Sequence, residues 1–436
     1  MIKAHSLMAI AITALLAACG GGSDSETAKP TPSNEIALDV VLQDYSCPDS
    51  SKQPLANADV LLHDGNGKLL GQFKANSNGH FAHSYNDQIK FVTVYKANAS
   101  SSFNVLTYAI DKGGDLGKVG VYGVTGVSCN CKNLTIDATD LRRTMSEYRI
   151  QTYLTATDLD SWLYQDQTSV QACAGRNGKY GKLQLMLTPN QGGISYSRDI
   201  DLDSYNSSQV VLNISDFKRH GRTVAVQAGR DVQAGSFVQT TDGAVYSSGF
   251  YGGQTAQVQV YDQGSAQQFV RATWNMQAVD TQNRIVNLLQ YQQQSLDASA
   301  SSIQLNTSMS PTIVLRNIEA LEQAQRNRRA TVFDLNNGTY NLARYVTSAD
   351  KYLWVLQLAP QMAVPVFEWP STLNAAMTSN NVYWVNLIAT RYNPSWTYSQ
   401  YMDYQTQASR LDSYYNANSQ LLRFVSDSAF LSVNRQ

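Results

Sequence analysis

Short apolar runs that end at Gly- or Asn-rich turns recur from residue 36 onward, and they restrict the fold more than any other feature. The run IALDVVLQDY begins at Ile36, and the run NADVLLHD ends at Asp64. Between two turns, Phe81, His83 and Tyr85 alternate with smaller residues, and this period of two indicates a half-buried strand. Gly and Asn adopt the positive φ that tight hairpins need. The pattern therefore predicts short antiparallel strands joined by hairpins.

The composition is typical of an exported β-protein. Charged residues make up only 15% of the chain, whereas there are 25 tyrosines. Solubility then comes from neutral polar side chains, and tyrosine favours strands. The 33 Lys and Arg residues nearly balance the 34 Asp and Glu residues, so a nucleic-acid partner is not expected. We predict an all-β protein built from tandem antiparallel β-sandwiches.

Strand candidates follow one another at intervals of about 8 to 12 residues, which is typical of sandwiches and barrels. They predict a first β-sandwich at 35–130, sandwich-like domains at 131–215 and 216–309, and an aromatic-rich β domain at 310–436. No internal repeat is evident by eye, so one large sheet assembly or a propeller is the alternative. A single short helix is expected at 317–329, as a linker between units.

The N-terminal segment predicts an export signal followed by a tether. The apolar run from Leu7 to Leu16 follows a short start that carries one cation, Lys3. As a helix this run is about 15 Å long, half of a bilayer core, and is therefore too short to be a membrane span. Residues 1–18 are predicted to be a signal peptide. Residues 19–34 are rich in Gly, Ser, Pro and charge, and are predicted to be a flexible tether.

The stretch Leu16-Ala17-Ala18-Cys19 resembles the lipobox of bacterial lipoproteins. In that family the cysteine thiol receives a diacylglyceryl group, and cleavage makes this cysteine the new N-terminus. The resemblance implies lipidation of Cys19 and an anchor of several acyl chains, palmitate among them, in which each buried CH₂ contributes about 0.8 kcal/mol. Gly20 stands where inner-membrane lipoproteins commonly have aspartate, which implies the outer membrane. The alternative is an ordinary secretory signal.

A second resemblance lies between Pro54 and Tyr85, which is similar to the carboxypeptidase regulatory-like, or transthyretin-like, module. The matching features are Pro and Ala before a strand, a D-x-x-G turn that begins at Asp64, and an N-x-x-G-x-F return strand that begins at Asn76. The resemblance implies a β-sandwich at 35–130 that is an accessory or spacer domain without catalytic residues.

Four cysteines besides Cys19 are predicted to form two disulfides, because an even count in an oxidising compartment favours pairing. These are Cys47, Cys129, Cys131 and Cys173. Cys129 and Cys131 are too close to bridge each other without strain, so each is expected to reach Cys47 or Cys173. A bond of either kind is expected to tie the first domain to the start of the next. The Cys-x-Cys spacing is narrower than that of structural zinc sites.

The sequence contains no catalytic signature. The motifs of serine hydrolases, zinc proteases and nucleotide-binding proteins are absent, and His220 is the only histidine after His83, so a nucleophile with a histidine base is not expected. We predict no catalytic residue, no cofactor and no metal. The three clustered histidines, His63, His80 and His83, are interpreted as core or rim residues rather than as zinc or copper ligands.

Alternating aspartates raise the question of a calcium loop. The glycine that such a loop needs is replaced by Ser204, and its last ligand by Val210. We interpret the series as a solvated strand face with Ile200 and Leu202 inward. Paired carboxylates for glycoside cleavage stay open, because the fold sets their spacing. The aspartates interpreted as a solvated strand face are Asp199, Asp201 and Asp203, and Asp158 and Asp160 are interpreted in the same way.

The C-terminal domain is the most aromatic part of the chain. Its rings are Trp354, Trp369, Trp384, Trp396, Tyr392, Tyr398, Tyr401, Tyr404, Tyr414 and Tyr415. Trp396, Tyr398, Met402 and Tyr404 are expected to share one strand face, as in a sandwich interior. Exposed rings would instead suit a glycan or a partner protein.

We therefore predict a non-enzymatic, lipid-anchored protein of the cell envelope. Its role is expected to be binding, adhesion or scaffolding through β-sandwich domains, with the membrane and an unidentified envelope protein as partners. The alternative is a glycan-binding or carbohydrate-active lipoprotein that uses the C-terminal aromatic residues.

Overall fold

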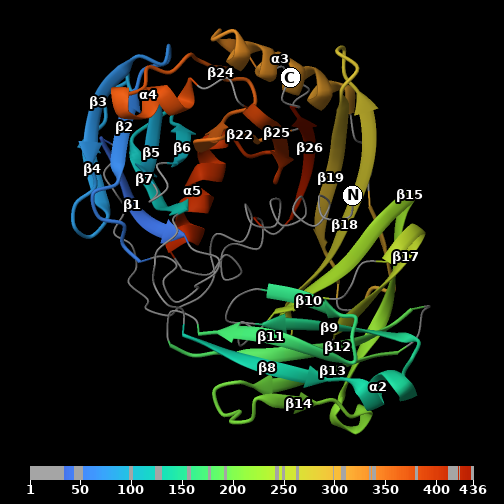
Figure 1. The fold of residues 1–436 in the computed structure, drawn as a ribbon. Helices are drawn as coiled ribbons and strands as arrows, with labels where there is room; N and C mark the ends of the chain where they lie inside the picture. The colour runs from blue at the N-terminus through green and yellow to red at the C-terminus, as the bar shows by residue number, and fades with distance from the viewer. Residues whose placement is uncertain are drawn as a thin grey trace.

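The computed structural model of the chain consists mostly of strands, arranged as two β-sandwiches joined by a long sheet (Figure 1). The predicted all-β, multi-sheet fold is confirmed. The structure describes residues 34–43, 53–97, 102–122, 130–154, 159–174, 178–190, 194–240, 245–247, 251–261, 265–297, 299–305, 311–332, 335, 340–378, 382–410, 421 and 423–433. The predicted signal peptide, Cys19 and nearly all of the predicted tether lie outside these residues.

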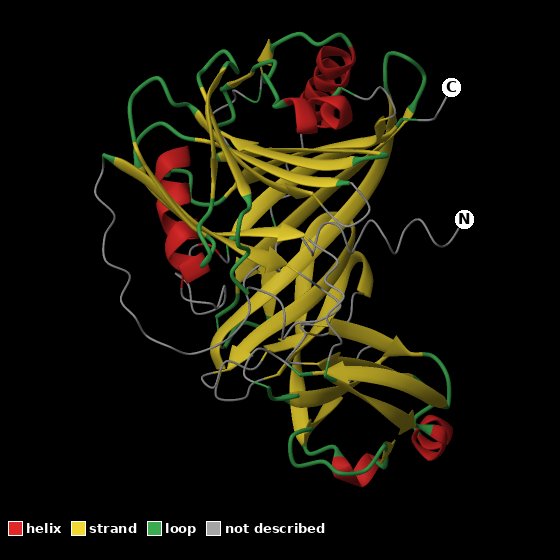
Figure 2. Ribbon diagram, turned by 60° about the vertical axis from the view of Figure 1, so that its left-hand side comes forward, coloured by secondary structure: helices red, strands yellow, loops and turns green. Residues whose placement is uncertain are grey.

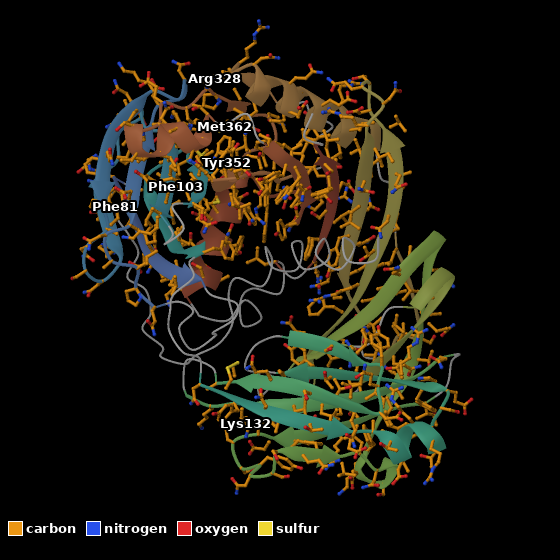
Figure 3. The ribbon with its side chains drawn as sticks, viewed as in Figure 1. Phe81, Phe103, Lys132, Arg328, Tyr352 and Met362 are labelled. Atoms are coloured by element: carbon orange, nitrogen blue, oxygen red, sulfur yellow. A yellow bond between two sulfur atoms is a disulfide. The ribbon has the colours of Figure 1, made fainter. Side chains whose placement is uncertain are left out.

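The first sandwich has two sheets, ordered β4-β1-β7 and β3-β2-β5-β6. Strand β1 pairs antiparallel with β4 and parallel with β7. Leu38, Val60, Val94 and Phe81 pack between the two sheets. Phe81 is labelled in Figure 3. The strands are β1 (Glu35–Gln43), β2 (Asp59–His63), β3 (Leu69–Lys74), β4 (His80–Ser84), β5 (Phe91–Ala97), β6 (Phe103–Ala109) and β7 (Gly114–Tyr122).

The second sandwich has sheets ordered β11-β8-β14 and β10-β9-β12-β13. Leu134, Ile150 and Leu185 lie in its core. Its elements are β8 (Cys131–Asp137), α2 (Thr139–Thr144), β9 (Tyr148–Leu154), β10 (Leu159–Leu163), β11 (Gln167–Cys173), β12 (Lys182–Pro189), β13 (Ser195–Asp201), β14 (Gln209–Val211) and the short 3-10 helix η1 (Ile214–Asp216).

The two sandwiches have the same topology, although no repeat is evident in the sequence. Strand β8 pairs antiparallel with β11 and parallel with β14, as β1 does with β4 and β7. The second sheets also correspond strand by strand, so that β2, β3, β5 and β6 match β9, β10, β12 and β13. Because a strand requires only alternation, two copies of one topology need not share recognisable residues.

Seven further strands, which we call the bridging sheet, connect the sandwiches and pair antiparallel with one another throughout. They continue the β3-β2-β5-β6 sheet of the first sandwich and the β10-β9-β12-β13 sheet of the second. Strand β23 at one end pairs parallel with β6, and β15 at the other end pairs antiparallel with β13. Phe103 and Tyr352, labelled in Figure 3, are register partners at the first junction. In spatial order the strands are β15 (Arg219–Thr240), β18 (Ser265–Val279), β19 (Ile285–Ser295), β26 (Phe424–Ser432), β25 (Val382–Arg391), β22 (Leu342–Ala349) and β23 (Tyr352–Leu358).

Smaller elements flank the bridging sheet. Figure 2 shows its long strands running from the upper part of the molecule down to the second sandwich. Strand β15 also pairs with β16, β17 and β20. These elements are β16 (Val245–Ser247), β17 (Tyr251–Tyr261), β20 (Ser302–Gln304), α3 (Pro311–Arg326), β21 (Thr331–Val332), β24 (Ala363–Val364), α4 (Ser371–Met377) and α5 (Tyr398–Arg410).

The predicted linker helix at 317–329 is observed as α3, which begins six residues earlier and ends at Arg326. Val314 and Ile318 of α3 belong to one apolar cluster with Leu288 and Leu387 of the bridging sheet. The helix therefore covers one face of this sheet. None of the helices in the described residues combines the length and apolar character needed to cross a bilayer.

Hydrogen-bonded ladders connect the predicted domains with one another. Strand β6 lies within 35–130, whereas its partner β23 lies within 310–436; β13 lies within 131–215, and its partner β15 within 216–309. Each predicted domain therefore shares a sheet with another one. The division into four β domains stays a prediction.

Candidate functional site

The second sandwich contains the disulfide between Cys131 and Cys173, with an S–S distance of 2.04 Å. The two residues are direct register partners on β8 and β11. A bond from Cys131 to Cys173 is one of the pairings predicted from the sequence, and it is confirmed. The expectation that such a bond ties the first domain to the next was wrong for this pair, because both cysteines belong to the same sheet. Cys19, Cys47 and Cys129 lie outside the described residues, so lipidation and the second disulfide stay predictions.

The three clustered histidines lie in different environments. His63 is fully buried on β2, and its Nε2–H donates to the carbonyl oxygen of Glu368 at 3.0 Å. Burial lowers the pKa of His63 from 6.5 to about 4. His80 lies on the other sheet of the sandwich, where its Nδ1 is 2.8 Å from Asp39 Oδ1, and His83 packs on Phe73. No group of three His, Cys, Asp or Glu side chains in the described part of the chain converges as metal ligands would.

Two of the alternating aspartates, Asp201 and Asp203, organise a turn. Asp201 Oδ1 accepts from the backbone N–H of Asp203 at 3.0 Å, and the Asp203 carboxylate accepts from the backbone N–H groups of Tyr180 and Gly181 at 2.8 and 3.2 Å. Ile200 is buried beneath the series, as expected. These carboxylates therefore close the turn after β13. Asp158 and the side chain of Asp160 lie outside the described residues.

The expected strand through the C-terminal aromatic residues was wrong, because Tyr398–Arg410 is the helix α5. A capping box starts it: Gln400 N–H donates to Thr397 Oγ1 at 3.2 Å, and Thr397 N–H donates to Gln400 Oε1 at 2.9 Å. The T-x-x-Q pattern in the sequence could have predicted this helix start.

The aromatic rings around α5 stack on one another. The ring centroids of Trp396 and Tyr404 are 4.3 Å apart, and those of Tyr392 and Tyr401 are 4.9 Å apart. Trp396 and Tyr401 are only 9% and 3% exposed. These rings therefore belong to the core between α5 and the bridging sheet. Tyr414 and Tyr415 lie outside the described residues.

A buried polar centre that the sequence analysis missed lies around Asp427 on β26. This carboxylate is 2% exposed and accepts hydrogen bonds from Tyr340 Oη and Gln290 Nε2. Burial, together with the charge of Asp427, raises the pKa of Tyr340 well above its ordinary value. The phenol thus stays protonated and donates. Asp427, Ala429 and Leu431 lie on the same face of β26, since they are two residues apart. A charged residue on an otherwise apolar strand face was the sequence signal that could have revealed this polar centre.

An ionic cluster connects α5 to the first sandwich. Arg410 Nε and Nη2 lie 2.8 and 2.6 Å from the two carboxylate oxygens of Asp115, and Arg410 Nη1 pairs with Asp39. Asp39 in turn contacts His80. The cluster therefore joins β1, β4 and β7 to a helix from the other end of the chain.

The carboxylates of the Asp427 centre and of the Arg410 cluster are engaged in contacts within the protein. Retaining and inverting glycosidases need two carboxylates a set distance apart. Asp427 has a phenol and an amide as its hydrogen-bonding partners, and Asp115 and Asp39 are paired with Arg410. The best-defined functional feature is therefore the frame itself, in which a single sheet contacts both sandwiches.

The geometry defines the class as an all-β protein of several sheets. No protein-family model matches the chain, and no curated protein matches it, so no named relative identifies it as an enzyme. Among solved structures, the Bacillus anthracis TIE protein matches with 9% identity over 63% of this chain and 50% of that one, at a TM-score of 0.15. This chain spans half the length of that structure, and so low a score carries no argument.

Proposed function

We propose that this chain is a non-enzymatic, lipid-anchored protein of the bacterial cell envelope that holds two β-sandwiches on one connecting sheet and binds an envelope protein through them. The observation that carries the proposal is the bridging sheet, which pairs with the corresponding strand of each sandwich, β6 in the first and β13 in the second. Backbone hydrogen bonds at both junctions limit the relative motion of the sandwiches.

Further contacts support this arrangement. The first sandwich is held by the β6–β23 ladder and by the Arg410 cluster. The second contains the disulfide between Cys131 and Cys173. A pre-organised surface loses little conformational entropy when a partner binds, which is the physical advantage of such a scaffold.

The anchor and the outer-membrane location belong to the same proposal. They depend on the lipobox-like stretch that ends at Cys19 and on the tether-like composition of residues 20–34. Glycan binding by the C-terminal aromatic residues has less support, because Trp396 and Tyr404 stack on each other and leave little ring surface for a sugar.

In-cell photo-crosslinking tests the proposal. A photoreactive phenylalanine analogue replaces Tyr164 of the second sandwich, 80% exposed, or Leu70 of the first, 40% exposed; Val279 at the tip of the bridging sheet, 60% exposed, is the matched control site. We expect one envelope protein to be captured from both sandwiches and not from the control. Capture from neither sandwich, or equal capture from all three sites, contradicts the proposal.

A further inference from the structure

The two sandwiches differ in the sheet face that points away from their own cores. In the first sandwich this face carries Leu61, Phe91, Tyr95 and Val105, which pack in a large apolar cluster with residues of the bridging sheet. In the second sandwich the corresponding face is polar. We call the following five residues the polar face: Gln151 of β9, Gln184 and Thr188 of β12, and Ser195 and Ser197 of β13.

All five residues of the polar face are buried, with exposed fractions of 0 to 2%. Neither Oε1 nor Nε2 of Gln184 has a hydrogen-bond partner among the described residues, and the same holds for Thr188 Oγ1 and Ser197 Oγ. Buried polar groups in native proteins are nearly always paired, because leaving them unpaired forfeits the hydrogen bonds they make with water. Three such side chains, Gln184, Thr188 and Ser197, lie together on this face.

The polar face lies at the weaker of the two junctions. Tyr153 and Met186, on the same side of the sheet, share an apolar cluster with Val224 of β15 and Val258 of β17. The β13–β15 ladder that joins the second sandwich to the bridging sheet spans three residue pairs, whereas the β6–β23 ladder spans six. Opening the second junction therefore breaks fewer backbone bonds, and it allows the unpaired groups to form hydrogen bonds.

The polar face offers neutral hydrogen-bonding groups bordered by aromatic rings. Two amides and three hydroxyls each both donate and accept hydrogen bonds, and none of the five residues carries a charge. The one carboxylate directly beside Gln184 on this side of the sheet is that of Asp199. Trp162 on β10 is the register partner of Gln151, and Tyr153 lies on the same side. Hydroxyl groups and C–H faces of a neutral sugar match neutral hydrogen-bonding groups bordered by aromatic rings.

We propose that the polar face of the second sandwich binds a neutral oligosaccharide when its junction with β15 and β17 opens. This site differs from the C-terminal aromatic region and does not depend on the lipid anchor. Gln184 is its central hydrogen-bonding group, since it lies between Tyr153 of β9 and Asp199 of β13 in the register.

The test compares Gln184→Leu with a matched control, Thr93→Val. Thr93 lies on the corresponding strand and face of the first sandwich, but its hydroxyl is paired with Thr107 at 3.0 Å. Gln184→Leu removes an unpaired amide at similar volume, so Tm is expected to rise by about 2 °C. Thr93→Val breaks a buried hydrogen bond, and Tm is expected to fall.

Binding is measured by calorimetry on the full chain in detergent, with maltohexaose, cellohexaose, laminarihexaose and N-acetylchitohexaose as probes. We expect at least one probe to bind, with affinity at least tenfold weaker for Gln184→Leu and unchanged for Thr93→Val. Thr188→Val serves as the second variant if Gln184→Leu does not fold. Binding of none of the four probes, or binding that both polar-face variants leave unchanged, overturns the proposal. The envelope-partner experiment is unaffected by either result.

Hydrogen exchange tests the opening. Backbone amides of the β13–β15 ladder are expected to exchange at least tenfold faster than those of the β6–β23 ladder. The bound probe is expected to change the exchange rates of the β13–β15 amides and to leave those of the β6–β23 amides unchanged. Equal protection of both ladders overturns the opening step.

Discussion

Arg410, the last residue of α5, forms a two-pronged ion pair with Asp115 of β7, at 2.8 and 2.6 Å, across 295 positions of sequence. Bidentate pairs of this kind are stronger than single contacts and fix the orientation of both groups. The pair lies at the side of the first sandwich, where a helix from the C-terminal region covers β7. The pair thereby attaches the C-terminal helix α5 to the first sandwich.

We predict that Arg410→Ala lowers the free energy of unfolding by about 1–3 kcal/mol, because it leaves Asp115 and Asp39 partly buried without their cation. The matched control is Arg143→Ala, whose partner Asp140 is exposed, with exposed side-chain fractions of 78% and 63% for the pair. Exposed pairs contribute little, so the control is expected to change stability by less than about 0.5 kcal/mol. Urea unfolding measures both, and equal effects contradict the prediction.

The pH dependence of stability is expected to depend on His63. Its pKa is about 4 in the folded protein and 6.5 when unperturbed. The unfolded chain therefore binds the proton first as pH falls, so stability is lost between about pH 6.5 and 4 and is unaffected above that window. The loss approaches about 3 kcal/mol below pH 4. His63→Gln should reduce this slope in urea midpoints measured against pH, whereas His80→Gln should retain it; an unchanged slope for His63→Gln excludes the assignment.

Removing the disulfide is expected to destabilise the chain. The bond closes a loop with a sequence separation of 42, and chain entropy predicts a contribution of about 4 kcal/mol for a loop of this length. The Cys131→Ser, Cys173→Ser double variant is compared with the parent protein by thermal unfolding. A Tm that matches the parent protein would show that the bond contributes nothing.

The Asp427 centre is expected to stabilise the bridging sheet. Asp427→Ala leaves Tyr340 Oη and Gln290 Nε2 buried without their acceptor, which costs about 2–4 kcal/mol. The matched control is Ser432→Ala. Ser432 lies on the same strand but is exposed, so its substitution is expected to change stability by less than about 0.5 kcal/mol. Chemical unfolding of the two variants measures the difference, and similar stabilities would refute the role of the centre.

The lipid anchor is tested through Cys19. Cys19→Ser is expected to release the protein from the membrane fraction, because serine provides no thiolate to receive the diacylglyceryl group. Cell fractionation measures the distribution, and mass spectrometry of the N-terminal peptide of the unsubstituted protein identifies the modification. Membrane sedimentation of the serine variant, or an unmodified thiol in the native peptide, contradicts the anchor.

Local structure was predictable where short-range chemistry decides it. The D-x-x-G pattern identified the turn at Asp64, and Asp64 Oδ1 accepts the backbone N–H of Asn66 at 2.8 Å, as the turn requires. Only the tertiary structure shows a second reason for Gly67. Its φ is +86°, and a Cβ there would lie 2.4 Å from the carbonyl oxygen of Val366. Gly67 is therefore favoured both by the turn conformation and by the close approach of the Val366 backbone.

Alternation and turn chemistry in the sequence determined that this chain forms β-sheets, because a period of two and glycine-containing turns act within a few residues. The tertiary structure alone decided which strands meet. Val105 pairs with Trp354 through backbone groups that every residue carries, so no side-chain pattern specifies that register. The matching topologies of the two sandwiches, the bridging sheet and the buried polar face follow from this long-range pairing.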